Sequence, residues 1–308
     1  MKNQLTLLLL ATLSAAGQVH FNPGAIAIEI DGQPFTEFHY GTDVGKPYLA
    51  PLRAASGTIV TRRYPMEKIE GESRDHLHHR GLWFTYDDVN GIKFWENDPS
   101  YTNQNIGHVV PRSSQWTEQP KNGSLTLDFD WMDPHGKVLL GEHRVMTFYS
   151  NPTLRIVDFD ITLTAPKKVV FGDTKEGAFA IRLADALSEK HGGRMTNAEG
   201  KSGMAEVWGH RSKWVDYSGS IDGEKLGVAI FDYPRNPRFP TYWHSRDYGL
   251  FALNPFGQKA FDKEALESHW SLEAGHSLRF IWRVVIHPGD TASAHIGDLY
   301  DEFARGTK

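Results

Sequence analysis

Histidine, arginine, carboxylate and indole side chains are concentrated in one short part of this chain. Residues 75–83 read Asp-His-Leu-His-His-Arg-Gly-Leu-Trp, and residues 87–95 add two further aspartates and a second tryptophan. Histidine changes its protonation near neutral pH, and arginine binds anionic and carbonyl oxygens. Tryptophan offers a flat apolar face with one hydrogen-bond donor. This mixture favours a site for a polar, ring-shaped ligand over a solvated loop.

The order of the histidines also suggests a metal site. If residues 76–79 are extended, His76 and His78 share one face, as His-x-His ligand pairs on a strand do. No third or fourth ligand is evident downstream. We therefore expect no cofactor, and a divalent metal held by His76 and His78 is the alternative.

A second segment, residues 171–182, has a composition suited to acid–base chemistry. Asp173, Lys175 and Glu176 lie between two glycines, immediately before a predicted strand that ends at Arg182. Glycine lets the backbone approach a ligand closely, and a lysine beside a carboxylate changes its proton affinity. A charged hairpin in water is the alternative.

Two later segments, residues 207–219 and 231–249, combine aromatic rings with hydrogen-bonding side chains. The second contains three prolines between positions 234 and 240, which predict a stiff, non-helical loop. Aromatic platforms beside polar groups are suited to holding sugar rings. The alternative for Trp208 and Trp214 is a place in the hydrophobic core.

Together the four segments predict a saccharide site. The candidate catalytic residues are His78, His79, Arg80, Asp173 and Glu176. The candidate substrate-binding residues are Trp83, Asp88, Trp95, Lys175, Arg182, Trp208, Arg211, Trp214, Tyr217, Arg238, Trp243, His244, Arg246 and Asp247.

The residue types leave the reaction open, because hydrolysis, β-elimination and epimerisation each need one acid and one base. We favour a hydrolase over a lyase or an epimerase. A non-catalytic carbohydrate-binding protein that uses the same aromatic residues is the alternative. A metal-dependent oxygenase or lyase, which depends on the histidine cluster, is the third hypothesis.

Alternation of apolar and polar residues dominates the rest of the chain. It predicts half-buried antiparallel strands at residues 125–131, 157–164, 179–183 and 278–286. One segment, residues 296–303, has helical spacing instead. We expect an all-β fold, a single large antiparallel β-sandwich over residues 18–308, with a C-terminal helix.

The composition excludes several classes of protein. The 308 residues include no cysteine, which rules out disulfides and thiol catalysis, and the net charge of −5 without a basic run argues against a nucleic-acid partner. Lys2, an apolar run at 5–13 and small residues at 14–17 predict a signal peptide over residues 1–17 and export to the periplasm or beyond. An uncleaved membrane anchor is the alternative. No later run reaches the roughly 20 apolar residues of a membrane span, and the oligomeric state stays open.

Several motifs together resemble a bacterial family of secreted proteins labelled "methane oxygenase PmoA-like". They are His-Leu-His-His-Arg-Gly-Leu-Trp at 76–83, Gly-Asp-Thr-Lys-Glu-Gly at 172–177, the tryptophan segment at 208–219, and Tyr-Trp-His-Ser-Arg-Asp-Tyr-Gly-Leu at 242–250. The resemblance covers nearly the whole mature chain and implies a shared fold and shared site positions. It does not imply methane chemistry, which would need several spanning helices. Large sandwiches of the galactose mutarotase type offer an analogy, since they too open a sugar site on one sheet.

Overall fold

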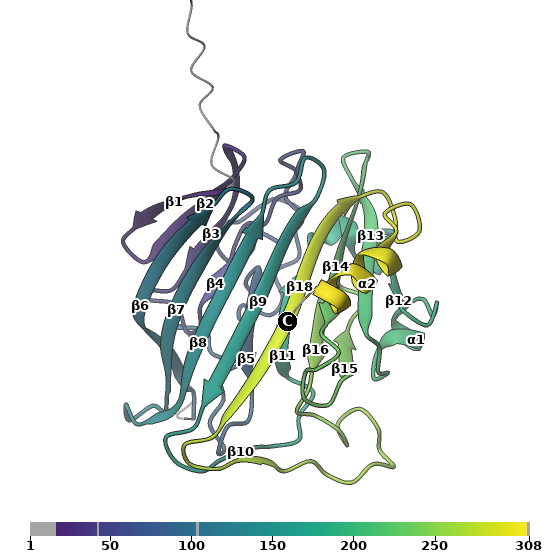
Figure 1. Ribbon diagram of the computed structural model, residues 1–308. Coiled ribbons are helices and arrows are strands. Elements are labelled where there is room, and N and C mark those ends of the chain that lie inside the picture. Colours follow the sequence, from purple (N-terminus) through teal and green to yellow (C-terminus); the bar gives the residue numbers. More distant parts are fainter. Residues whose placement is uncertain (1–16, 42, 103–104, 307–308) are drawn as a thin grey trace, which may run out of the picture.

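Two antiparallel sheets of eight strands each face one another in the computed structural model, which describes residues 17–41, 43–102 and 105–306 (Figure 1). The strand order is β1-β2-β3-β4-β5-β11-β16-β15 in the first sheet, called sheet A here. In the second, called sheet B, it is β12-β13-β14-β18-β9-β8-β7-β6. This confirms the predicted antiparallel β-sandwich. The predicted signal peptide lies outside the described residues, apart from its last position.

Most strands of sheet B are long, whereas those of sheet A are shorter and several of them are joined by long connections. Sheet A contains β1 (Gly17–Asn22), β2 (Ala25–Ile30), β3 (Gln33–His39), β4 (Tyr48–Leu49), β5 (Leu82–Tyr86), β11 (Gly177–Arg182), β16 (Leu250–Asn254) and β15 (Tyr242–Ser245). Sheet B contains β12 (Arg194–Asn197), β13 (Trp214–Ile221), β14 (Glu224–Asp232), β18 (Ser277–Pro288), β9 (Arg155–Thr164), β8 (Val138–Tyr149), β7 (Asn122–Met132) and β6 (His108–Gln119). A separate pair joins β10 (Val169–Phe171) to β17 (Trp270–Leu272). The α-helices are α1 (Met204–Val207) and α2 (Ile296–Gly306), and single 3₁₀ turns cover Asp185–Leu187 and Glu189–His191.

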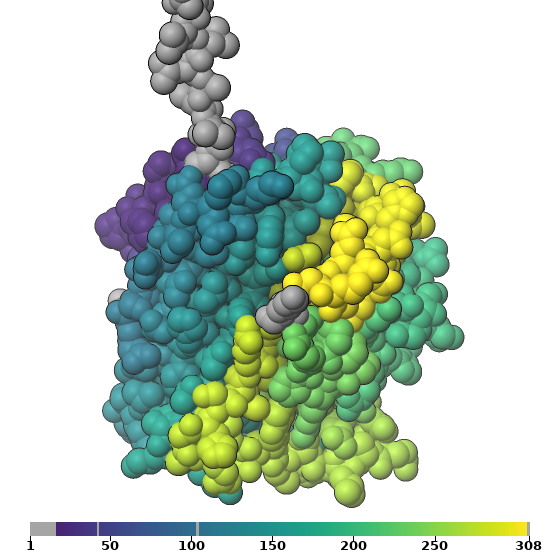
Figure 2. Space-filling view, viewed as in Figure 1, coloured from purple at the N-terminus to yellow at the C-terminus, as the bar shows by residue number. Residues whose placement is uncertain are grey.

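Apolar residues at every second position form the core between the sheets. On β7, Leu125, Leu127, Phe129 and Trp131 are fully buried, and the residues between them are partly exposed. The helix α2 covers the outer face of sheet B, where Ile296 and its neighbours pack on an apolar cluster separate from the main core (Figure 1). In the space-filling view the C-terminal residues, in yellow, lie on the surface of this sheet (Figure 2). A helix therefore covers part of the outer face of sheet B, and loop side chains pack over the outer face of sheet A.

Two local predictions were wrong. The segment 231–249 is not a loop throughout, because β14 continues to Asp232 and β15 pairs with β16 at the edge of sheet A. The prolines shape only the stretch that precedes β15, after which alternation resumes with Trp243 in the core. The histidines at 76–79 are not extended either. His76 has a φ of +45°, and the His79 N–H donates to its carbonyl at 3.0 Å, so the chain turns there.

Within the described ranges, none of the helices has the length and apolar character needed to cross a membrane.

A buried ion pair fixes sheet B near α2. His287 Nε2 on β18 lies 2.9 Å from Asp216 Oδ1 on β13, and both side chains are fully buried. Thr291 Oγ1 donates to the other carboxylate oxygen at 2.5 Å. Burial alone would lower the pKa of His287, but the hydrogen bond and charge of Asp216 raise it above its ordinary value. The carboxylate thus ties two strands to the segment that leads into α2.

Replacing Asp216 with alanine should destabilise the fold strongly. The substitution leaves a buried imidazole and a threonine hydroxyl without their acceptor, so the free energy of unfolding should fall by roughly 3–5 kcal/mol. Urea denaturation at pH 7 measures this. Asp160→Ala is the matched control, because its partner Arg279 is 55% exposed and such surface pairs contribute roughly 0–1 kcal/mol. Equal losses in the two variants would contradict the structural role of Asp216.

Candidate functional site

The outer face of sheet A carries a row of side chains from five adjacent strands. The strand register places Tyr48, Trp83, Ala180, Ala252 and His244 side by side on β4, β5, β11, β16 and β15. Each of these residues is buried. Two alanines lie in the middle of the row, and loop side chains pack over this face. The row is the floor of the candidate site.

Residues 75–80 form a turn that is called the histidine loop here. Its aromatic rings stack above one part of the floor. The His76 ring lies 4.6 Å from that of His79 at 2°, and 5.3 Å from Tyr248 at 13°. The His79 ring in turn lies 5.3 Å from Trp83 at 24°. Burial lowers the pKa of His79 and of His78 far below the ordinary histidine range. Both imidazoles are therefore neutral at physiological pH and can each donate and accept a hydrogen bond.

Two buried arginines hold that loop in place through one carboxylate. Arg62 and Arg182 are both fully buried, and both form ion pairs with Asp75, at 2.7 Å in the case of Arg182. Arg62 also donates to the carbonyls of His76 at 2.9 Å and His79 at 3.2 Å. Burial would raise the pKa of Asp75, but the hydrogen bond from His76 and the two guanidinium charges hold it well below its ordinary value.

A buried lysine lies beside the tryptophans. Lys46 Nζ donates to the Trp95 carbonyl at 2.6 Å and to Asn97 Oδ1 at 2.8 Å, and it lies 5.6 Å from the centre of the Trp83 ring. Burial and the charge of Arg80 lower the pKa of Lys46 well below its ordinary value. The amine is thus fixed close to the floor.

Polar contacts anchor the next part of the histidine loop. Arg80 pairs with Asp98, and His78 Nδ1 lies 3.1 Å from Tyr101 Oη. These partners come from residues 98–101, so that segment and the histidine loop are held together.

Acidic groups lie beside the floor, beyond the paired ends of β5 and β11. The Asp87 N–H donates to the Glu176 carbonyl at 3.0 Å, which places the two residues side by side just beyond the paired ends of β5 and β11. Burial and nearby carboxylates, including Glu176, raise the pKa of Asp87 and the charge of Lys93 lowers it, with a net value of about 6. Glu176 pairs with Lys175 and is only 21% exposed. Two neighbouring carboxyl groups therefore have different environments.

His244 faces these carboxylates. Its Nδ1 lies 3.9 Å from Glu176 Oε2, which is too long for a hydrogen bond. Burial, together with the charges of Lys175 and Arg246, lowers the pKa of His244 to about 3. The ring is therefore neutral and close to the acidic end of the site.

Several buried polar atoms of this face have no hydrogen-bond partner among the described residues. They are Trp83 Nε1, Thr85 Oγ1, Asp87 Oδ1, Trp95 Nε1, and His244 Nδ1 and Nε2. A buried polar atom without a partner costs free energy, and native proteins contain few of them. Their concentration on one sheet face indicates a surface shaped for a polar ligand.

The structure brings many of the sequence-predicted site residues together on this face. They are His76, His78, His79, Arg80, Trp83, Trp95, Lys175, Glu176, Arg182 and His244. Arg246 and Trp208 lie at its edge, with the guanidinium 5.9 Å from the indole ring.

Other predicted residues lie elsewhere. Trp214 packs beneath α2 on sheet B, and Tyr217 and Trp243 lie in the main core. The carboxylate of Asp173 accepts backbone N–H groups from residues 258, 259, 260 and 268.

The remaining predicted residues have structural contacts of their own. Asp88 closes a turn with the Gly91 N–H, and Arg211 and Arg238 donate to backbone carbonyls. Asp247 lies 3.8 Å from Lys190. These side chains form hydrogen bonds or ion pairs with other parts of the chain, and their role is therefore to stabilise the loops in which they lie.

Sequence reasoning missed some residues of the face, namely Lys46, Arg62, Asp75, Asp87, Asp98, Tyr101 and Tyr248. A signal for Asp87 was present, because it follows Trp83 and Thr85 at every second position and so shares their face. Lys46 and Arg62 gave no such signal, since only the fold brings them to the histidine loop.

The described ranges contain no group of three or more His, Cys, Asp or Glu side chains that could hold a metal ion. The rings of His76 and His78 lie 5.7 Å apart at 75°. A metal remains a prediction.

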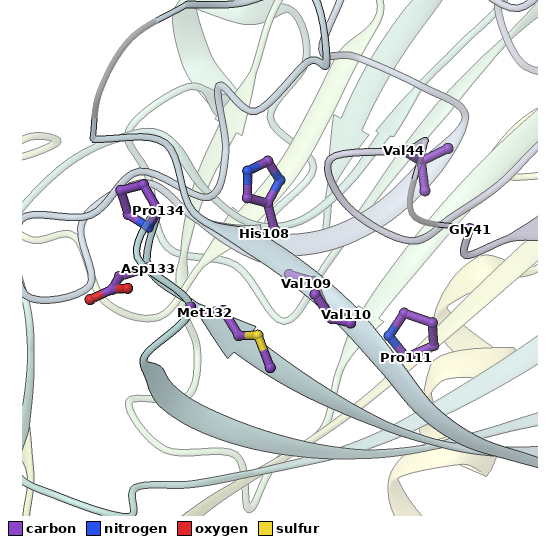
Figure 3. Close-up of a pocket in the computed structure, with 10 residues that line it drawn as sticks. Gly41, Val44, His108, Val109, Val110, Pro111, Met132, Asp133 and Pro134 are labelled. Atoms are coloured by element: carbon purple, nitrogen blue, oxygen red, sulfur yellow. The ribbon is translucent and has the colours of Figure 1, made fainter.

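A separate cavity of about 310 Å³ lies where β6 and the end of β7 meet Gly41 and Val44 (Figure 3). Its lining is largely apolar, with His108 and Asp133 as the ionisable residues. None of the residues of the candidate site lines it.

Comparison with known proteins places the chain in a family. Residues 25–301 match the family described as "Family of unknown function (DUF6807)". The chain belongs to this family. No curated protein matches it.

Solved structures that are similar to the chain share little of its sequence. An α-galactosidase from Lactobacillus brevis is 8% identical with a TM-score of 0.47, over 96% of this chain and 43% of that one. A GH36 α-galactosidase from Geobacillus stearothermophilus is 8% identical with a TM-score of 0.44, over 89% and 40%. A galactose mutarotase-like protein from Clostridium acetobutylicum is 8% identical with a TM-score of 0.45, over 89% and 99%. The chain thus spans less than half the length of these α-galactosidases.

Replacing Asp75 with asparagine should loosen the histidine loop. Because the pKa of Asp75 is lower in the folded state, its ionised form stabilises the fold above about pH 4, and this contribution is lost as the pH falls further. The neutral amide removes the carboxylate that pairs with two buried guanidinium groups. The loss at pH 7 should lie at the low end of roughly 3–5 kcal/mol, because water screens the half-exposed carboxylate.

Urea denaturation at pH 7 and pH 3 tests this, with Glu67→Gln as a control in an exposed pair with Arg63. Wild type should lose more stability than the Asp75 variant on acidification. If acidification costs both proteins the same, Asp75 does not hold the loop.

Proposed function

We propose that the outer face of sheet A is the site of a carbohydrate-active enzyme that performs acid–base chemistry on a saccharide. The observation that carries the proposal is the set of buried, unpartnered polar atoms beside flat rings. A sugar ring has C–H faces that pack on aromatic side chains and hydroxyls that both donate and accept hydrogen bonds. The unpartnered atoms include donors, such as Trp83 Nε1, and acceptors, such as Asp87 Oδ1.

Asp87 and Glu176 are the acid and the base in this proposal. Asp87 keeps its proton up to a pH of about 6, the raised pKa that burial gives it, and can donate that proton to a leaving oxygen. Glu176, which pairs with Lys175, is the base. Hydrolysis is favoured among the acid–base reactions because glycoside hydrolysis commonly uses two carboxyl groups in unequal environments.

The histidines then have a binding role. His78, His79 and His244 have lowered pKa values, so they are neutral, weak bases that suit hydrogen bonding to hydroxyls better than proton transfer. The guanidinium group of Arg182 lies over the ring of Tyr248, with its carbon 4.6 Å from the ring centre. This refines the prediction that the histidines themselves form the reacting centre.

Export fits this role. We infer that the segment 1–17 directs the chain out of the cytoplasm, to surroundings in which it meets polysaccharides of other organisms. We also infer that the resemblance to the secreted PmoA-like family reflects a common carbohydrate ligand.

Replacing Asp87 with asparagine should abolish turnover and preserve binding. A panel of p-nitrophenyl glycosides measures turnover, and calorimetry with the matching free sugars measures affinity. For a glycoside that wild type cleaves, kcat should fall by about 10²–10⁴-fold, with the Kd of the sugar changed less than threefold. In wild type, kcat/KM should decline above a pH of about 6, because the acid form of Asp87 is lost there.

Asp88→Asn is the matched control, since this neighbouring carboxylate closes a turn and lies outside the site. Full activity in the Asp87 variant would refute its role as the acid. Sugar binding by wild type without turnover of any glycoside would instead identify a non-catalytic carbohydrate-binding protein. Neither binding nor turnover would overturn the saccharide proposal.

A further inference from the structure

A second feature lies away from this face, at the end of the sandwich where β9 begins (Figure 1). A cavity of about 160 Å³ lies there between the β2–β3 turn, the turn at residues 54–57 and the first residue of β9. Arg53 and Arg155 line it together with Gln33, Ser56 and Gly57. No carboxylate is among its lining residues. Two cations thus face a small cavity without an acidic partner in its wall.

Arg155 is the more unusual of the two. It is the first residue of the inward-facing series that continues with Val157 and Phe159, and it is only 4% exposed. Its Nη1 donates to the carbonyls of Asn151 at 3.0 Å and Leu154 at 3.1 Å. Its Nε has no hydrogen-bond partner in the part of the chain that the structure describes. The charged guanidinium group of Arg155 therefore lies at the end of the core, and the N–H donor of its Nε is not used by the described residues.

No carboxylate compensates this charge directly. Among the ion pairs of the described residues, none includes Arg155. Burial lowers the pKa of Arg155, and the negative charge of Asp31 offsets this only in part. Asp31 accepts a hydrogen bond from Ser150 Oγ at 2.6 Å. Because an uncompensated buried charge is costly, the site is better satisfied by an anion from solution.

Arg53 supplies the second cation. It is half-buried and, within the described residues, is in no ion pair. The adjoining cavity contains a carboxylate, that of Glu224, but this group accepts a hydrogen bond from Thr58 Oγ1 at 2.5 Å. Arg53 also lines a neighbouring cavity that contains Glu37 and Glu67, so the absence of an acidic side chain holds for the wall that Arg53 shares with Arg155.

We infer that this cavity binds a small oxyanion, namely a sulfate, phosphate or carboxylate group, between Arg53 and Arg155. The planar fork of guanidinium donors matches the oxygens of such groups, and the Ser56 hydroxyl adds a further donor. The lining shares no residue with the candidate site on sheet A. The inference is thus independent of the proposed function.

Calorimetric titration of the full-length protein with sodium sulfate, in a chloride buffer of matched ionic strength, tests the inference. Wild type should bind sulfate with a stoichiometry of one. Arg155→Met should abolish binding, and Arg53→Met should weaken it at least tenfold. Arg194→Met is the control, because Arg194 is exposed, lines none of the cavities described here and contacts Ser202; it should bind as wild type does.

The folding of the variants is checked separately. Without sulfate, Arg155→Met should melt at or above the wild-type temperature, since methionine removes an uncompensated buried charge. Its loss of binding then cannot come from misfolding. Absence of sulfate binding in wild type, or equal binding in wild type and Arg155→Met, would overturn the inference.

A further titration distinguishes the source of the oxyanion. Inorganic phosphate and glucuronate are compared with sulfate, and neutral glucose serves as the blank. Binding of sulfate and phosphate alone supports a free inorganic anion, whereas at least tenfold tighter binding of glucuronate supports a carboxylate carried by a sugar. Glucose binding of equal strength at this cavity would contradict an anion site.

Discussion

The candidate site depends on one carboxylate shared by two buried guanidinium groups. Asp75 pairs with Arg62 and Arg182, and Arg62 at the same time holds two carbonyls of the histidine loop. Arg182 belongs to β11, so the arrangement joins a loop to the middle of sheet A. The stack of rings from Tyr248 to Trp83 exists only because that loop is held against the sheet. Coulomb attraction between these charged groups thus sets the positions of the stacked rings.

Buried polar groups in this protein fall into two kinds. Some are fully paired within the chain, as Asp216 is with His287 and Thr291, and these tie strands together. Others keep unused hydrogen-bonding capacity, as His244 and Arg155 do. The paired group Asp216 joins strands of sheet B, whereas His244 lies on the sheet A face and Arg155 lines a cavity.

The sequence predicted the sandwich well because side-chain alternation has a direct physical cause. A strand with one face in the core must alternate, and β7 and β9 do so along their whole length. The same alternation does not say which sheet a strand joins, so Trp214, on sheet B, and Trp83, on sheet A, look alike in sequence. Density of polar residues identified the histidine loop and Glu176. It could not identify Lys46, whose partners lie about 50 residues away along the chain.

The roof of the sheet A face comes from connections rather than from strands. Segments near residues 46, 62–80, 95–101 and 246–248 contribute to it, and each joins a different pair of elements. The floor beneath them consists of strand residues whose neighbours fill the hydrophobic core. Insertions and substitutions in connecting loops are tolerated far better than changes in core strands. The roof of this face can therefore change in sequence while the floor, which is part of the packed sandwich, stays the same.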